Sequence, residues 1–186
     1  GRCRRSSVKL PRPTCPSSSA AATVYCTLNF PSSPVAGIGR SAAGPGAARL
    51  RIARIAAGSG ASEFFLGGIT AYSLDEKVRH LGVNRVAAKK VNCVSAEVAV
   101  QMARGVCGLF GADVGVATTG YAEPSAADGV PTPFAWWAVA HRGARGKFSL
   151  RHGWVECPGE PRVEVQQMVA AAAVAELGAF LRELRG

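Results

Sequence analysis

Apolar residues recur with a helical period in two long stretches of the chain. Between residues 96 and 110 they return every four residues, which places them on one stripe of a helix. Ser95 is a suitable N-cap for this helix, and Gly111 is a suitable end. The second stretch, residues 163–184, predicts a long amphipathic helix near the end of the chain. Its apolar positions are Val165, Val169, Ala172, Leu177, Phe180 and Leu184.

Four other stretches are rich in aromatic and β-branched residues and predict buried strands. They are residues 64–72, 113–120, 133–140 and 147–156. We expect the strand 113–120 to lead into a glycine loop and the strand 133–140 to be buried on both faces.

A short helix is expected between the first strand and the helix 96–110. Ser73 and Glu76 have the spacing of a capping box, and Gly82 follows as a helix end. The alternation of strands and helices is typical of α/β proteins. We therefore expect an α/β fold, a three-layer α/β/α domain with a mixed sheet, preceded by an irregular basic N-terminal arm.

Charge and composition divide the chain near residue 60. All 12 acidic residues follow residue 60, so the net charge of +10 arises mainly from the basic residues before it. Residues 1–59 are rich in Arg, Ser, Ala, Gly and Pro, which leaves few groups to bury. This segment resembles a transit peptide, coding DNA translated in the wrong frame, or a basic tail that binds nucleic acid. We expect a basic low-complexity arm at 1–59 and the folded domain at 60–186.

The cysteine spacing and the hydropathy pattern bear on metals, membranes and location. The 6 cysteines lack the spacing of a zinc site, so no metal or cofactor is expected, and Cys93 and Cys107 should be buried free thiols. No stretch has the 18 or so consecutive apolar residues of a membrane span. We expect no membrane partner, and we do not expect a nucleic-acid partner. The expected location is cytoplasmic, or organellar if the arm is a transit segment.

Four ordered segments carry a resemblance to a known family. They are residues 60–73 with Lys77, Leu81–Val83, residues 93–103 and residues 111–120. Together they resemble the C-terminal domain of the CinA (competence/damage-inducible) family, of the nicotinamide-nucleotide amidohydrolase type. The form found here is similar to a divergent branch of short, stand-alone members. The resemblance covers about two thirds of the chain.

The resemblance implies hydrolysis of the carboxamide of nicotinamide mononucleotide to nicotinic acid mononucleotide and ammonia. Tyr72 and Lys77 match the family's tyrosine and lysine, and Lys77 is expected to act as a base or to polarise Tyr72. The expected substrate-binding residues come from the glycine pair of the first strand and from the end of the strand 113–120. They are Gly67, Gly68, Thr118, Thr119 and Gly120.

The sequence departs from the family pattern in two places. The family's nucleophile segment, Glu-Ser-x-Thr-x-Gly, is expected near Gly44, but residues 40–46 contain only Ser41 as a poor substitute. Glu123 also stands where the family more often has a glycine that leaves backbone N–H groups open to a phosphate. Because Tyr72 and Lys77 then have no nucleophile to activate, the sequence predicts slow or absent hydrolysis. The alternative is a non-catalytic relative that binds nucleotides or self-associates.

Two adjacent tryptophans bear on partners. Trp136 and Trp137 can stack on a nicotinamide ring, or they can supply core on one face of a strand and a subunit interface on the other. The second interpretation, together with the resemblance, predicts a homodimer or larger assembly.

Overall fold

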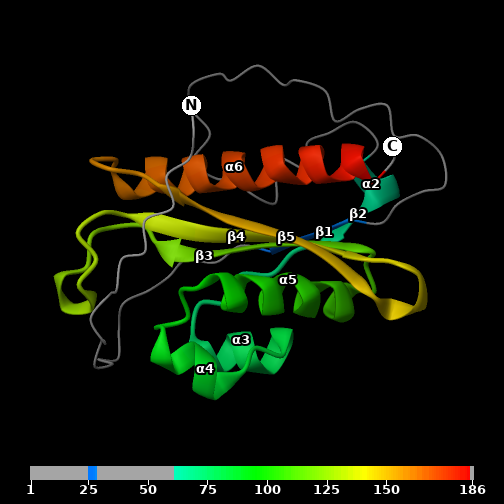
Figure 1. Cartoon of the computed structure of the whole chain (residues 1–186), viewed down its shortest axis with the longest axis horizontal. Helices are drawn as coiled ribbons and strands as arrows, with labels where there is room; N and C mark the ends of the chain where they lie inside the picture. Colours follow the sequence, from blue (N-terminus) through cyan, green and yellow to red (C-terminus); the bar gives the residue numbers. More distant parts are fainter. Residues whose placement is uncertain (1–24, 29–60, 185–186) are drawn as a thin grey trace.

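A computed structural model describes residues 25–28 and 61–184, with the backbone alone for 25–28, 61 and 62. A sheet lies between two helical layers, with the helices α3 and α4 outside α5 (Figure 1). The predicted three-layer α/β/α arrangement is therefore confirmed. The strands are β1 (Tyr25–Leu28), β2 (Phe65–Gly67), β3 (Val114–Tyr121), β4 (Phe134–Arg142) and β5 (Phe148–Glu156). The α-helices are α2 (Ala61–Phe64), α3 (Leu74–Leu81), α4 (Arg85–Lys90), α5 (Ala96–Phe110) and α6 (Arg162–Glu183).

The sheet has the strand order β2-β1-β3-β4-β5. Every pairing among the described strands is antiparallel, so the expectation of a mixed sheet is corrected. The connections explain this arrangement, because β3, β4 and β5 follow one another directly as hairpins. The second hairpin closes through Gly143 N–H, which donates to the carbonyl of Lys147 at 2.8 Å.

The strand predicted at residues 64–72 is much shorter than expected. Phe64 belongs to α2, and β2 ends at Gly67, where the backbone has φ +153°. The chain then crosses toward α3, and Ala71 is buried with Ile69 against the core without pairing in the sheet. The apolar character of this segment thus comes from packing against α5 and not from strand pairing.

One strand lies inside the segment expected to be an irregular arm. β1 pairs with β2 on one side and with β3 on the other, so it joins β2 to the rest of the sheet. At least these four residues before residue 60 therefore belong to the sheet. The rest of the arm, including Ser41, lies outside the described residues.

The predicted helix ends are confirmed. Ser73 caps α3 and Ser95 caps α5, each accepting a hydrogen bond from a backbone N–H three residues on, at 3.3 Å and 3.2 Å. Gly82 and Gly111 end these helices in the left-handed conformation. The reciprocal half of the capping box is replaced, because the Glu76 carboxylate contacts the His80 ring at 2.8 Å. The sequence analysis missed α4, which Asn84 caps.

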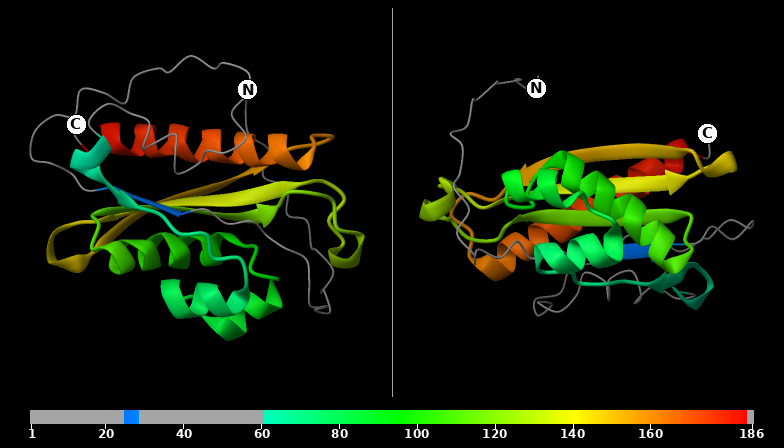
Figure 2. Two further views of the ribbon diagram at one scale, coloured as in Figure 1. Left: turned by 180° about the vertical axis from the view of Figure 1, so that it is seen from behind. Right: turned by 90° about the horizontal axis from the view of Figure 1, so that it is seen from below.

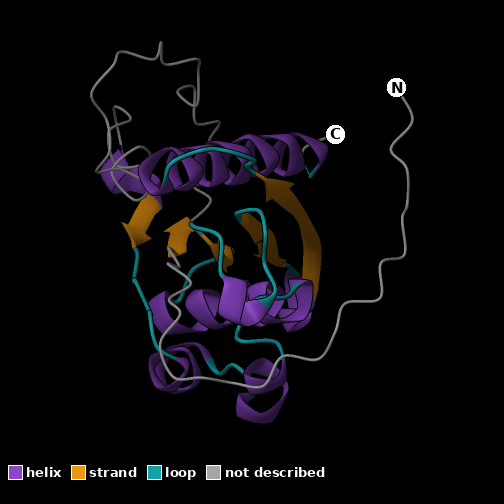
Figure 3. Ribbon diagram, turned by 90° about the vertical axis from the view of Figure 1, so that its left-hand side faces the viewer, coloured by secondary structure: helices purple, strands orange, loops and turns teal. Residues whose placement is uncertain are grey.

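Helices cover both faces of the sheet (Figures 2 and 3). On one face, α5 packs on small residues of β3 and β4 and, on its outer side, against α3. On the other face, α6 packs on Val114, Val116, Trp137 and Val139. Of the described helices, α6 is the one whose length and composition alone would let it cross a membrane, and its buried residues form part of this core.

Candidate active site

Lys77 is a charged residue that is buried in the interior of the domain. It lies on α3, and only 1% of its surface is exposed. Leu81, one helical turn further on, packs in the α5-facing core, so both side chains lie on the inner face of α3. Burial lowers the pKa of the Lys77 ammonium, and the nearby Cys93 thiol opposes this shift in part. A lysine in this state can exist as a neutral amine and act as a base.

Lys77 forms no ion pair with the carboxylates of the described residues that are known to be paired. Those carboxylates pair with histidine or arginine side chains. Residues 1–60 contain no Asp or Glu that could provide such a partner. A buried lysine normally forms an ion pair, because burying an isolated charge is costly.

Cys93, which influences the pKa of Lys77, belongs to a turn between α4 and α5. Asn92 and Cys93 both adopt left-handed backbone conformations, with φ of 48° and 62°. The hydroxyl of Thr119 donates to the carbonyl of Cys93 at 2.7 Å, and the amide of Asn92 donates to the hydroxyl of Tyr121 at 2.9 Å. These two hydrogen bonds hold the turn against the C-terminal end of β3. The sequence analysis did not assign the turn a role, although an asparagine tolerates positive φ and was a local signal.

The predicted phosphate-binding threonines point to opposite faces of β3. Thr119 faces α5, where its hydroxyl bonds to Cys93. Thr118 pairs across the sheet with Trp137, which packs under α6, and its buried hydroxyl has no partner among the described residues. Gly120 lies in the strand and not in a loop, and a Cβ there would come within 2.4 Å of Ala135 Cα. Thr118 and Thr119 thus point to opposite faces of the sheet, and the binding role of these three residues stays a prediction.

The glycine pair of the first strand lies elsewhere in the sheet. Gly67 pairs with Thr27, which also pairs with Gly115 near the start of β3. Along β3, Thr118 and Gly120 are three and five residues further on, about 10–17 Å away at a strand's rise. Gly67 instead packs on Phe110, where a Cβ would come within 2.8 Å of the ring.

Tyr72 is exposed over 47% of its surface and contacts charged groups at the start of α6. Burial lowers the pKa of Arg162, but hydrogen bonds with Glu123 and Tyr72 outweigh this effect, so the pKa is raised overall. The Arg162 guanidinium donates to the Glu123 carboxylate at 2.8 Å. Glu123 and Tyr72 therefore share Arg162 as a partner.

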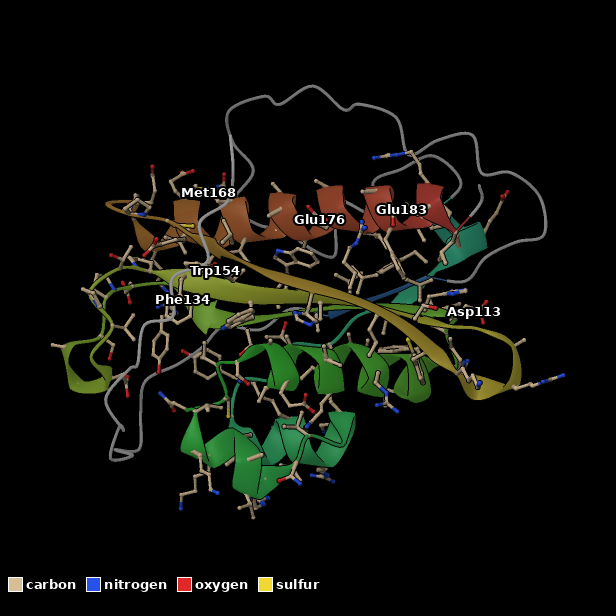
Figure 4. The ribbon with its side chains drawn as sticks, in the orientation of Figure 1. Asp113, Phe134, Trp154, Met168, Glu176 and Glu183 are labelled. Carbon is tan, nitrogen blue, oxygen red and sulfur yellow. The ribbon has the colours of Figure 1, made fainter. Side chains whose placement is uncertain are left out.

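Four aromatic residues form a row at the same end of the sheet. Tyr121, Phe134, Trp154 and Trp136 follow one another with ring-centre distances of 5.8, 6.4 and 6.4 Å. Phe134 and Trp154 lie side by side near the β3–β4 connection (Figure 4). Trp154 is 55% exposed, whereas Trp137 is buried on the α6 face. Since Tyr121 also bonds to Asn92, this row extends from the turn at Cys93 to the surface.

Two further sequence predictions concern metals and thiols. Among the residues that the structure describes, no three His, Cys, Asp or Glu side chains gather as a metal site would need. Cys93 and Cys107 are buried and belong to no disulfide, as predicted.

Comparison with curated proteins finds CinA-like relatives. A CinA-like protein of Chlorobium limicola is 37% identical over 126 residues, 67% of this chain. A CinA-like protein of Salinibacter ruber is 37% identical over 116 residues, 62% of this chain. The matches span 29% and 27% of the length of these two relatives.

Solved structures with related folds come from the same group. A CinA superfamily protein of Klebsiella pneumoniae is 27% identical, with a TM-score of 0.51 over 60% of this chain and 67% of that one. A competence or damage-inducible protein of Enterobacter asburiae is 26% identical, with a TM-score of 0.50 over the same shares. The family model of the CinA C-terminal domain matches residues 47–181. The chain therefore belongs to the CinA family through this C-terminal domain.

Proposed function

We propose, against the slow or absent hydrolysis expected from the sequence, that this chain hydrolyses the carboxamide of a nicotinamide nucleotide, with nicotinamide mononucleotide as the substrate to test first. The observation that carries the proposal is Lys77, a buried lysine with a lowered pKa. Membership of the CinA family makes amide hydrolysis the reaction to consider for such a base.

A neutral amine suits both halves of amide hydrolysis. It accepts a proton from the attacking group, and the resulting ammonium returns that proton to the nitrogen that leaves as ammonia. Burial lowers the pKa of the Lys77 ammonium and so favours the neutral amine more than in an exposed lysine. Lys77 thereby acts as a proton carrier between the nucleophile and the leaving group.

The aromatic row supports a planar substrate. Trp154 and the half-buried Trp136 offer ring faces at the surface, and aromatic faces stack on planar heterocycles. Tyr121 joins this row to the Asn92–Cys93 turn through its hydroxyl. In this proposal the ring of the substrate lies along the row, and its carboxamide points toward Lys77.

The test is ammonia release from nicotinamide mononucleotide by the full chain and by two lysine variants. Lys77→Met keeps the length of the side chain but removes the amine, and it should lower kcat by about 10²–10⁴-fold, the usual contribution of a general base. Lys90→Met is the matched control, because Lys90 is exposed on α4. Equal rates for Lys77→Met and the unaltered chain would contradict the assignment of the base.

A further inference from the structure

The strand β5 forms one edge of the sheet and runs along its front in Figure 1. All 9 of its residues pair with β4 on one side. On its outer side, no strand among residues 25–28 and 61–184 pairs with it. A long edge strand presents a row of unpaired backbone groups, which folded proteins usually cover or pair with another chain.

The hydrogen bonds at the two ends of the β4–β5 pairing show which backbone groups face this open edge. Gly143 N–H donates to the carbonyl of Lys147, and Cys157 N–H donates to the carbonyl of Pro133. The register between these two bonds is uninterrupted. Backbone groups alternate in direction along a strand, so the odd-numbered residues of β5 bond to β4. The even-numbered residues therefore direct their N–H and C=O groups outward.

The side chains of the even-numbered residues share one face of the sheet, the face on which α5 packs. Phe148 packs against the core cluster under α5. Further along β5, Leu150 and Trp154 are 43% and 55% exposed. His152, which lies midway between them, is exposed as well. The open edge thus carries two large apolar side chains at equal distances from its middle residue.

Charge is also distributed symmetrically about the middle of β5, but with opposite signs. Arg145 and Lys147 are exposed just before the strand begins. Glu156 and Glu160 are exposed at its end and just after it. A second β5 that runs in the opposite direction brings the basic end of each strand to the acidic end of the other. Such complementarity favours one orientation of a pair and disfavours the reverse.

We propose that the open edge of β5 binds a second copy of this chain, through antiparallel pairing of two β5 strands about a twofold axis at His152. In this register Leu150 lies opposite Trp154 of the second copy, and symmetry repeats the contact. Even-numbered residues then lie opposite even-numbered residues, so the outward N–H and C=O groups of both strands are paired. The sheets of the two copies become one continuous sheet.

The occupant is a second copy because β5 is complementary to its own reversed sequence. The apolar pair and the two charged ends are matched together in the one register that pairs all 9 residues of each strand. The same register places Leu150 of the second copy beside Trp154, the most exposed ring of the aromatic row. Each copy therefore borders the aromatic row of the other. This inference does not depend on the proposed reaction.

The test is sedimentation equilibrium of the full chain over a range of concentrations. The chain should form a dimer, with twice the 19.2 kDa mass of one copy. Leu150→Lys should raise the dissociation constant of the dimer about tenfold, because it replaces the apolar contact twice by symmetry. Leu109→Lys is the matched control, because Leu109 is 44% exposed on α5 and lies away from the edge. It should leave the dissociation constant unchanged.

Charge exchange tests the orientation of the two strands. At low salt, Lys147→Glu and Glu156→Lys should each weaken the dimer, and the double variant should recover most of the affinity, because it restores opposite charges at both ends. A monomeric full chain, or a dimer that Leu150→Lys weakens no more than Leu109→Lys does, overturns the inference. A dimer that the double variant fails to restore overturns the antiparallel register.

Discussion

Thr118 and Thr119 are adjacent on β3, but their hydroxyl groups differ in hydrogen bonding. Thr119 satisfies the carbonyl of Cys93, whereas the buried hydroxyl of Thr118 has no partner among the described residues. Replacing each with valine, which has nearly the same shape, isolates the hydroxyl. Thr119→Val should lower the free energy of unfolding by about 1–3 kcal/mol, because it leaves a buried carbonyl unsatisfied. Thr118→Val should be neutral or stabilising, and chemical denaturation of both variants checks the pair.

If Thr118→Val were less stable than Thr119→Val, the Cys93 carbonyl would have another strong hydrogen-bond partner. That result would remove the support that we assign to β3 at this turn.

Lys77 should also make stability depend on pH. Because its folded-state pKa is lowered, the unfolded chain binds more protons between that pKa and the ordinary lysine value of about 10.4. The free energy of unfolding gained from this group therefore rises with pH across that window. In Lys77→Met this rise is absent, so the unaltered chain should gain stability relative to the variant between pH 7 and pH 10. Urea denaturation at the two pH values measures this, and parallel curves for the two proteins would show that Lys77 titrates normally.

At the scale of elements, helix ends were predictable and strand ends were not. Ser95 and Gly111 bound α5 because caps satisfy local backbone groups, and local chemistry can be read from neighbouring residues. Residues 64–72 looked like a strand because packing on α5 and pairing in a sheet select the same apolar side chains.

The contact between α3 and α5 depends on one glycine. A Cβ at Gly105 would lie 2.0 Å from the carbonyl oxygen of Leu81, whereas Gly108 on the same helix has open space around its Cβ position. Gly105→Ala should therefore push α3 outward and destabilise the fold by about 1–3 kcal/mol. Gly108→Ala should stabilise it by about 0.5–1 kcal/mol through helix propensity. Thermal unfolding compares the two, and a tolerated Gly105→Ala would mean that α3 packs less closely than described.

In the candidate site, too, features that depend on neighbouring residues could be predicted, whereas features that depend on residues distant in the sequence could not. Lys77 was predicted as a base from its match to the family, and its burial on α3 agrees with that role. The influence of Cys93 on the pKa of Lys77 was not predictable, because the two residues lie 16 positions apart in the sequence and on different elements. The five predicted substrate-binding residues remain a prediction, although the fold distributes them over two regions and both faces of the sheet.

At the scale of the whole molecule, β1 decides where the domain begins. The family model starts at residue 47, yet β1 lies before it and connects β2 to β3. The sequence hid this strand within a segment dominated by Ser, Ala, Gly and Pro, although residues 23–28 contain β-branched and aromatic residues.

Truncation tests this boundary. Removing residues 1–24 retains every described strand pairing, whereas removing residues 1–47 deletes β1 and leaves β2 without a partner. The shorter truncation should keep the melting temperature of the full chain, and the longer one should lower it by several degrees, as for the loss of a few kcal/mol. Equal melting temperatures for the two truncations would place β1 outside the stable domain.

The central claim is that a site built around Lys77 hydrolyses a carboxamide. Its most direct test is to incubate the full chain with nicotinamide mononucleotide in heavy-oxygen water and to analyse the products by mass spectrometry. The account predicts ammonia and nicotinic acid mononucleotide in equal amounts, with heavy oxygen in the new carboxylate. Recovery of unchanged nucleotide under conditions in which the chain is folded, or of a product whose carboxamide is intact, would contradict it.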